Sequence, residues 1–200
     1  MIYKHKKFSN SEIQGKDFED CTFIDCKFND LVFRFTNFTN CQFKDCDFSG
    51  GIFEIVGFSG CCFPESNLSN LDYGDADIRN CNFSNSLLTN SIFQKIKGKR
   101  VGDRKKLDLR DCKFENARLE NTLFVYCDLY GVRFEGADLE RGVFEKCDLR
   151  NSDFSGAKIG GAGFQDCIIK DTKLDVEGFI ALGNSNGFVM GDNVAPSQTQ

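Results

Sequence analysis

Apolar residues recur at every fifth position over most of the chain. One run of such positions leads from Phe8 to Phe93 without exception, and a second run, shifted by one residue, leads from Leu109 to Leu174. Nineteen of the 22 phenylalanines stand at these positions. A strand has a period of two and a helix a period of about 3.6, so a period of five fits neither and predicts a chain that turns a corner every five residues.

A second set of positions, two residues before those of the first set, also carries small or apolar side chains. It includes Cys21, Cys26 and Cys41 in the first run and Ala117 and Cys127 in the second. The remaining positions are mostly Asp, Asn, Ser, Gly, Lys, Arg and Glu, which suit turns and solvent. We therefore expect two inward side chains in each group of five residues.

Each group of five follows one motif: a small residue, Asp or Asn, a central Leu, Ile or Phe, and two mostly polar residues. Clear examples are Ala76–Asn80, Cys81–Asn85, Ala137–Arg141 and Ser152–Gly156. On this motif the chain resembles the pentapeptide-repeat family over residues 16–174. The resemblance implies an all-β fold, a right-handed quadrilateral β-helix with four groups per coil. About eight coils would form a rod of about 38 Å.

The spacing of the cysteines is consistent with a coil of four such groups. Cys41, Cys61 and Cys81 recur at every fourth group, and so do Cys127 and Cys147. The apolar positions of the second run also separate into columns of Leu or Phe at this spacing. Stacked aromatic side chains would give so thin a solenoid a core.

The pattern fails at both ends and once in the middle. We assign the β-helix to residues 1–174 with a loop inserted at 94–106, a C-terminal cap to 175–190 and a flexible tail to 191–200. The stretch from Asp175 to Leu182 predicts a short helix that ends at Gly183 and covers the last coil. At the other end Lys6 is polar at an inward position, so we expect an atypical first coil and a frayed terminus around His5.

The composition is typical of a single soluble domain. Of its 200 residues 40% are hydrophobic and 28% charged, and no apolar run is long enough to cross a membrane. No apolar stretch follows the charged N-terminal segment, so we expect no signal peptide and a cytoplasmic protein. The 11 cysteines, an odd number, should then be reduced thiols.

The sequence lacks the usual catalytic and metal-binding motifs. It has one His and no nucleophile elbow, phosphate-binding glycine loop or zinc-binding helix motif, and ten of the 11 cysteines stand at inward positions, where Cys acts as a small hydrophobe. We therefore expect no cofactor, no metal site and no enzymatic activity. Cys62 alone stands outside the inward positions, and its thiol should be the most accessible to reagents.

Charge is distributed unevenly along the chain. The net charge of −5 argues against direct binding to nucleic acid. Residues 94–106 include seven basic residues and one acid, whereas the rest of the chain has 18 basic and 29 acidic residues and a net charge of −11. The loop is a candidate protein contact, with a merely solvated insertion as the alternative. Its basic residues are Lys95, Lys97, Lys99, Arg100, Arg104, Lys105 and Lys106.

Two further surfaces are candidate contacts. In a coil of four groups Phe35, Ile55 and Lys95 share an outward column, so two apolar side chains would face solvent unless Ile96 or Val101 of the loop, or a partner, covers them. Four glutamates would form columns of like charge, at a cost of roughly 1 kcal/mol per stacked pair, and would imitate the phosphates of DNA. The four are Glu115, Glu120, Glu135 and Glu140.

Within the pentapeptide-repeat family, the chain is similar to the quinolone-resistance proteins in its length, acidity, protruding loop and apolar C-terminal segment. This resemblance implies a DNA-like rod that binds DNA gyrase or topoisomerase IV and protects it from quinolones. It also implies an end-to-end dimer through the C-terminal segment. The alternative is an interaction scaffold for an unrelated protein, bound through the basic loop or through Phe35 and Ile55. The apolar residues of the C-terminal segment are Phe179, Ile180, Leu182 and Phe188.

Overall fold

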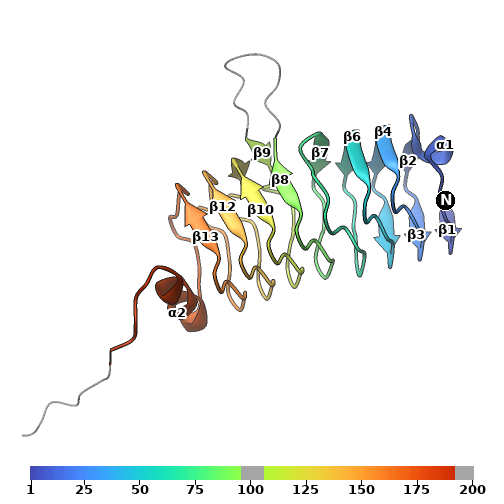
Figure 1. Ribbon diagram of the computed structural model, residues 1–200. Helices are drawn as coiled ribbons and strands as arrows, with labels where there is room; N and C mark the ends of the chain where they lie inside the picture. The colour runs from blue at the N-terminus through green and yellow to red at the C-terminus, as the bar shows by residue number, and fades with distance from the viewer. Residues whose placement is uncertain (96–105, 192–200) are drawn as a thin grey trace, which may run out of the picture.

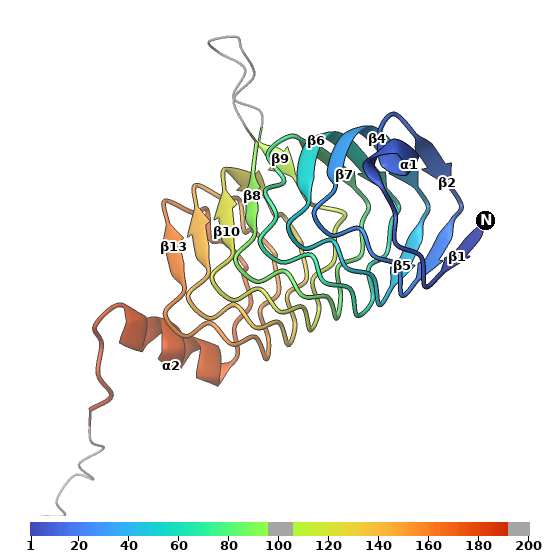
Figure 2. The same cartoon turned by 45° about the vertical axis from the view of Figure 1, so that its right-hand side comes forward.

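The computed structural model describes residues 1–95 and 106–191. The chain winds into a β-helix of about eight turns and ends in a short helix, α2, as the sequence predicts (Figure 1). Figure 2 shows the coils side by side along one axis, with the first coil and α2 at opposite ends of the rod.

The strands are short, and every strand pair is parallel. In chain order the elements are β1 (Ile2–Lys4), α1 (Asn10–Ile13), β2 (Asp17–Glu19), β3 (Thr22–Ile24), β4 (Val32–Thr39), β5 (Gln42–Lys44), β6 (Ile52–Ser59), β7 (Ala76–Arg79), β8 (Ile92–Gln94), β9 (Leu107–Asp108), β10 (Leu123–Val125), β11 (Cys127–Asp128), β12 (Val143–Glu145), β13 (Gly163–Gln165) and α2 (Val176–Ser185). They form sheets in the orders β1-β3-β5, β2-β4-β6-β7, β8-β10-β12-β13 and β9-β11. Single parallel bridges continue the pairing between the strands.

The register confirms that four groups of five make one coil. Phe23 pairs with Phe43, and Phe124 with Phe144, each four groups further along the chain. Across the insertion Phe93 pairs with Phe124, so that one coil is longer than the others by the inserted segment. The columns of stacked side chains therefore continue past the insertion on the same faces of the β-helix.

Two long ladders of stacked rings fill much of the core, and two ladders of three rings, Phe8/Phe28/Phe48 and Phe18/Phe38/Phe58, stand beside them in the first coils. Neighbouring rings of the longer ladder have centroids 4.7–5.3 Å apart and are nearly parallel. Rings of different columns meet edge to face, for example Phe124 and Phe134 at 5.8 Å. Both geometries are favourable for aromatic pairs, so each added coil extends the core. The longer ladder consists of Tyr3, Phe23, Phe43, Phe63, Phe83, Phe114, Phe134 and Phe154, and the shorter of Tyr73, Phe93, Phe124, Phe144 and Phe164.

The second inward position forms hydrogen bonds between coils. Cys41 donates its S–H to the carbonyl of Phe18, in the preceding coil, at 3.4 Å. Other inward cysteines repeat this bond, and Ser66 donates to the carbonyl of Phe43 at 2.8 Å in the same way. A small side chain with a donor therefore satisfies a buried carbonyl, which explains why Cys, Ser and Thr are common at this position.

The N-terminus is part of the β-helix, so the expectation of a frayed terminus is wrong. Strand β1 pairs with β3, and His5 Nδ1 lies 2.9 Å from Asp25 Oδ2. The polar inward residue Lys6 lies over the ring of Phe8 at 4.7 Å and forms an ion pair with Glu12 at 2.9 Å. Hydrogen bonds from Lys6 and Ser9 hold the pKa of Glu12 at about 2. These contacts replace the apolar packing of later coils.

Helix α2 covers only part of the last coil. Asp175 caps the helix by accepting the N–H of Gly178 at 2.8 Å, and Leu182 packs against the core. Ile169 stands at a central position of the last coil, yet 56% of its surface is exposed. The helix also continues past Gly183 to Ser185, contrary to the prediction, because the left-handed residue that follows it is Gly187, with φ of 84°.

Tyr73 carries a buried hydroxyl that has no hydrogen-bond partner in the part of the chain that the structure describes. Its ring stacks on Phe93 at 4.3 Å, so phenylalanine would keep the ladder. We predict that Tyr73→Phe raises the free energy of unfolding by about 1 kcal/mol, because an unsatisfied buried hydroxyl costs about 1–3 kcal/mol. Urea unfolding measures this effect. Tyr130→Phe is the control, since Tyr130 is exposed; a Tyr73→Phe protein less stable than wild type would contradict the prediction.

Candidate protein-binding surfaces

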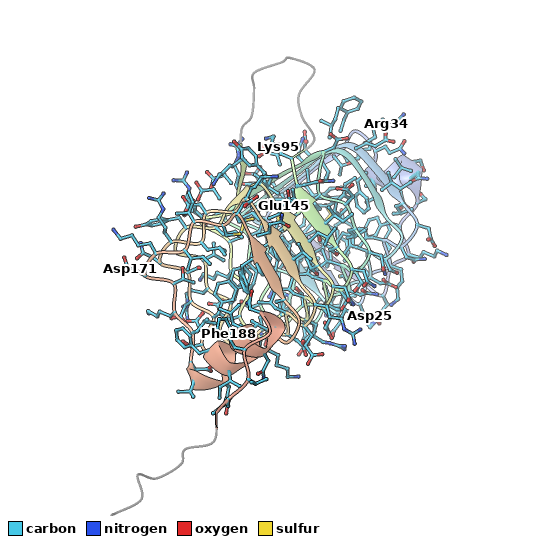
Figure 3. The ribbon with its side chains drawn as sticks, turned by 60° about the vertical axis from the view of Figure 1, so that its left-hand side comes forward. Asp25, Arg34, Lys95, Glu145, Asp171 and Phe188 are labelled. Carbon is cyan, nitrogen blue, oxygen red and sulfur yellow. The ribbon has the colours of Figure 1, made fainter. Side chains whose placement is uncertain are left out.

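The basic segment leaves and rejoins the β-helix at one corner. Lys95 directly follows β8, and Lys106 directly precedes β9. In the next coil β8 pairs with β10 and β9 pairs with β11. Because only the corner residue Tyr126 separates β10 from β11, both ends of the basic segment lie at this corner. Lys95 is exposed (Figure 3), and the ammonium of Lys106 lies 5.7 Å from the centre of the Tyr126 ring. Outside the described residues lie the other basic residues of the segment, Lys97, Lys99, Arg100, Arg104 and Lys105, together with Ile96 and Val101.

Phe35 and Ile55 lie at the same corner as Lys95, three and two coils nearer the N-terminus, and are 59% and 60% exposed. They stand one above the other, since Arg34 pairs with Glu54 on one side of them and Thr36 with Val56 on the other.

Their backbone is left-handed, with φ of 52° for Phe35 and 56° for Ile55. This conformation costs a residue with a β-carbon about 1–2 kcal/mol, and most other positions with positive φ in the described chain are Asn, Asp or Gly.

Ile52 belongs to the same surface, and sequence reasoning missed it. It is 54% exposed at the start of β6, one residue before the central Phe53. The sequence does contain a pattern that indicates it: on one side of the rod, the position before the central residue is apolar in several coils. These residues are Val32, Ile52, Ile92, Leu123 and Val143. We call Phe35, Ile52 and Ile55 the corner patch.

Three of the four predicted acidic residues are paired with arginine. Arg133 lies 3.3 Å from Glu115 and 2.9 Å from Glu135, and Arg118 lies 2.8 Å from Glu120. Arg133 thus bridges the stacked Glu115 and Glu135, which offsets the repulsion expected for that pair, whereas the Glu120 and Glu140 pair has a cation on Glu120 alone. Glu140 remains exposed, and its charge helps to raise the pKa of Lys158, after the larger effect of Asp138.

An aspartate–arginine ladder follows another side of the rod. Arg79, Arg110 and Arg150 each bind the aspartate two residues earlier, at 2.7, 2.7 and 2.6 Å. The arginine lowers the pKa of Asp148 through its hydrogen bonds. The sequence signal was the pattern Asp-x-Arg within single groups of five. Charges of both signs therefore alternate here, which breaks up any continuous acidic stripe.

The C-terminal end exposes apolar side chains on and after α2. Phe179, Ile180 and Phe188 are 62%, 38% and 73% exposed, whereas Leu182 is half-buried against the core. The exposed residues line an apolar groove of about 310 Å³ together with Val189 and Met190. Figure 3 shows Phe188 beside α2 at this end of the rod.

The cysteines lie where the repeat predicts. Burial raises the pKa of Cys46 and of Cys112 to about 12, and Cys62 is half-exposed. Within residues 1–95 and 106–191 no cluster of His, Cys, Asp and Glu is arranged to hold a metal ion. In the same ranges no helix is long and apolar enough to span a membrane.

We predict that iodoacetamide modifies Cys62 of the folded protein at least about ten-fold faster than Cys46 or Cys112, because a raised pKa leaves little reactive thiolate. Cys167, also half-exposed, should react more slowly than Cys62, since a hydrogen bond with Cys147 raises its pKa. Peptide mass spectrometry over time measures the rates, and Cys62→Ser should remove the fast phase. Equal rates at inward cysteines in the folded state would refute the assignment.

Comparisons with known proteins agree with this architecture. Residues 107–176 match a family described as pentapeptide repeat region, and residues 8–54 match pentapeptide repeats in eight copies. No curated protein matches the sequence.

Among solved structures, a trypsin-treated variant of QnrB1, a plasmid-mediated fluoroquinolone resistance protein, has a TM-score of 0.67 at 19% identity and covers 96% of this chain and 99% of its own. Full-length QnrB1 has a TM-score of 0.54 at 20% identity, covering 94% and 97%.

Proposed function

The chain belongs to the pentapeptide-repeat family, and we propose that it is a non-enzymatic, protein-binding rod whose partner is a type II topoisomerase, DNA gyrase or topoisomerase IV. The observation that carries the binding role is the grouping of exposed apolar side chains at two places, the corner patch and the C-terminal end. The choice of partner is supported by the similarity to QnrB1 in fold and by the acidity of the rod. Such a partner would require a cytoplasmic location.

A stiff rod suits this role. Each coil is joined to the next by parallel backbone hydrogen bonds and stacked rings, so the surface is preformed and little conformational entropy is lost on binding. A net charge of −11 outside residues 94–106 would steer the rod toward the basic surfaces of a DNA-binding enzyme. No direct contact with nucleic acid is needed.

Charge mimicry can be tested on the four glutamates. We predict that replacing Glu115, Glu120, Glu135 and Glu140 with Gln abolishes protection of gyrase from quinolones, measured as drug-stabilised DNA cleavage and as supercoiling. The matched control is Arg118→Gln with Arg133→Gln, which breaks the same ion pairs but makes the rod more acidic and should keep protection. Protection retained by the glutamine variant would refute charge mimicry through these residues.

The same assay tests the basic segment. A chain that lacks residues 95–106 should lose protection if Lys95, Lys106 and the basic residues between them contact the enzyme. Retained protection would show that the segment is a solvated insertion. If the intact chain has no effect on gyrase or topoisomerase IV, the topoisomerase proposal fails.

We also propose that two rods join end to end through the C-terminal segment, because α2 leaves Ile169 and Phe179 exposed. Phe179→Asp with Phe188→Asp should weaken the dimer by about 30-fold or more, as expected for the loss of central apolar contacts. Analytical ultracentrifugation measures the association. Ile2→Asp at the opposite end is the control, and a wild-type chain that is monomeric throughout would exclude the dimer.

A second candidate function is favoured by the corner patch. Its strained, exposed apolar residues lie on a different face from the paired glutamates. A protein other than a topoisomerase would use this surface, and the chain would then act as an interaction scaffold.

A further inference from the structure

Apolar exposure and backbone strain coincide at the corner patch. Ile55 is the one β-branched residue with positive φ among residues 1–95 and 106–191, and Phe35 beside it is also left-handed. Asparagine, common at the other corners, would relieve the strain and remove the exposed apolar surface. Stability of the fold therefore does not account for these two residues, and strained positions of this kind are often functional.

The surroundings of the patch are acidic on one side. In the next coil Asp72 takes the position of Ile52 and Asp75 that of Ile55, and both aspartates are exposed. Neither forms an ion pair within the described residues, although Asp72 accepts the N–H of Gly74 at 2.8 Å. The patch is thus an apolar surface with an unneutralised acidic edge.

Among the described residues, most other charges near the patch are paired, and the exception is Lys95, which is exposed in the same column one coil beyond Asp75. Arg34 precedes Phe35, Glu54 lies between Ile52 and Ile55 along β6, and the two charged side chains bind each other across the coils. Asp77, beyond the acidic edge, is bound to Arg79 at 2.7 Å. The unpaired charge on the edge next to the apolar residues therefore comes from Asp72 and Asp75, and Lys95 lies one coil beyond them. Figure 3 shows Arg34 on the same upper edge of the rod as Lys95, with the corner residue Asp25 on the opposite edge.

We propose that the corner patch binds an extended protein segment in which bulky apolar side chains alternate with Lys or Arg. The apolar side chains would pack on Phe35, Ile52 and Ile55, and the cations would meet Asp72 and Asp75. The proposal rests on the protein-binding role proposed above and names the chemistry of the partner at this surface. Charge complementarity selects this occupant, because a segment with acidic side chains would be repelled at the same edge.

The first experiment separates a binding role from a structural one. Phe35→Asn with Ile55→Asn should raise the midpoint of thermal unfolding, since asparagine tolerates the left-handed backbone. The control Glu65→Asn makes the same backbone change at the diagonally opposite corner, where φ is 59°. A lower midpoint for the double variant would show that the two apolar side chains hold the fold together, and would overturn the proposal.

The second experiment measures binding to the full chain by fluorescence anisotropy. The probe is a labelled peptide of alternating Leu and Arg, and its counterpart alternates Leu and Glu. We expect only the Leu/Arg peptide to bind, with affinity about ten-fold or more lower for Phe35→Asn with Ile55→Asn and for Asp72→Asn with Asp75→Asn. The Glu65→Asn protein should bind as wild type does.

Three results would overturn the proposal: no binding of the Leu/Arg peptide, equal binding by wild type and the Phe35→Asn, Ile55→Asn protein, or binding that appears only when residues 96–105 are deleted. The last would show that this chain's own basic segment occupies the patch. These results are independent of the gyrase assay, so failure of topoisomerase protection and failure of this proposal are distinguishable.

Discussion

The structure depends on the stacking of each residue on the one a coil away. Parallel backbone hydrogen bonds join neighbouring coils, and rings such as Phe43 and Phe63 stack on the same spacing, with centroids 5.1 Å apart. Many inward side chains, such as Cys41, Ser66 and Thr36, add a bond to a carbonyl of the preceding coil. Because every coil makes the same contacts with its two neighbours, the insertion at 94–106 lengthens one coil without disturbing the next.

A second constraint acts at the corners. Four turns in each coil bring many corner residues into the left-handed region, which Asn, Asp and Gly tolerate best. Departures from these residues are therefore informative. Phe35 and Ile55 combine an unfavourable backbone with exposure, and it is this combination, more than hydrophobicity alone, that marks the corner patch as a surface for a partner.

The groups that a partner could contact lie on the surface of the rod. Thiols with raised pKa values are held inside, carboxylates of the second half are bridged by arginines, and the apolar residues that remain exposed gather at the corner patch and at the C-terminal end. A preformed, stiff surface on which many charges are locally paired, although the rod as a whole is acidic, favours recognition by shape, by net charge and by a few unpaired groups. This view places Asp72, Asp75 and Glu140 among the charges available to a partner.

The sequence by itself determined the β-helix and its coil length. It also determined the inward columns and the exposure of Phe35 and Ile55, because a period of five residues predicts which side chains lie inside. Only the tertiary structure decided which charges are neutralised and how the ends are built. Arg133 reaches Glu115 in the preceding coil, and β1 pairs with β3 although Lys6 interrupts the apolar pattern. These contacts join different coils, and their geometry depends on side-chain length and direction, which spacing along the chain does not specify.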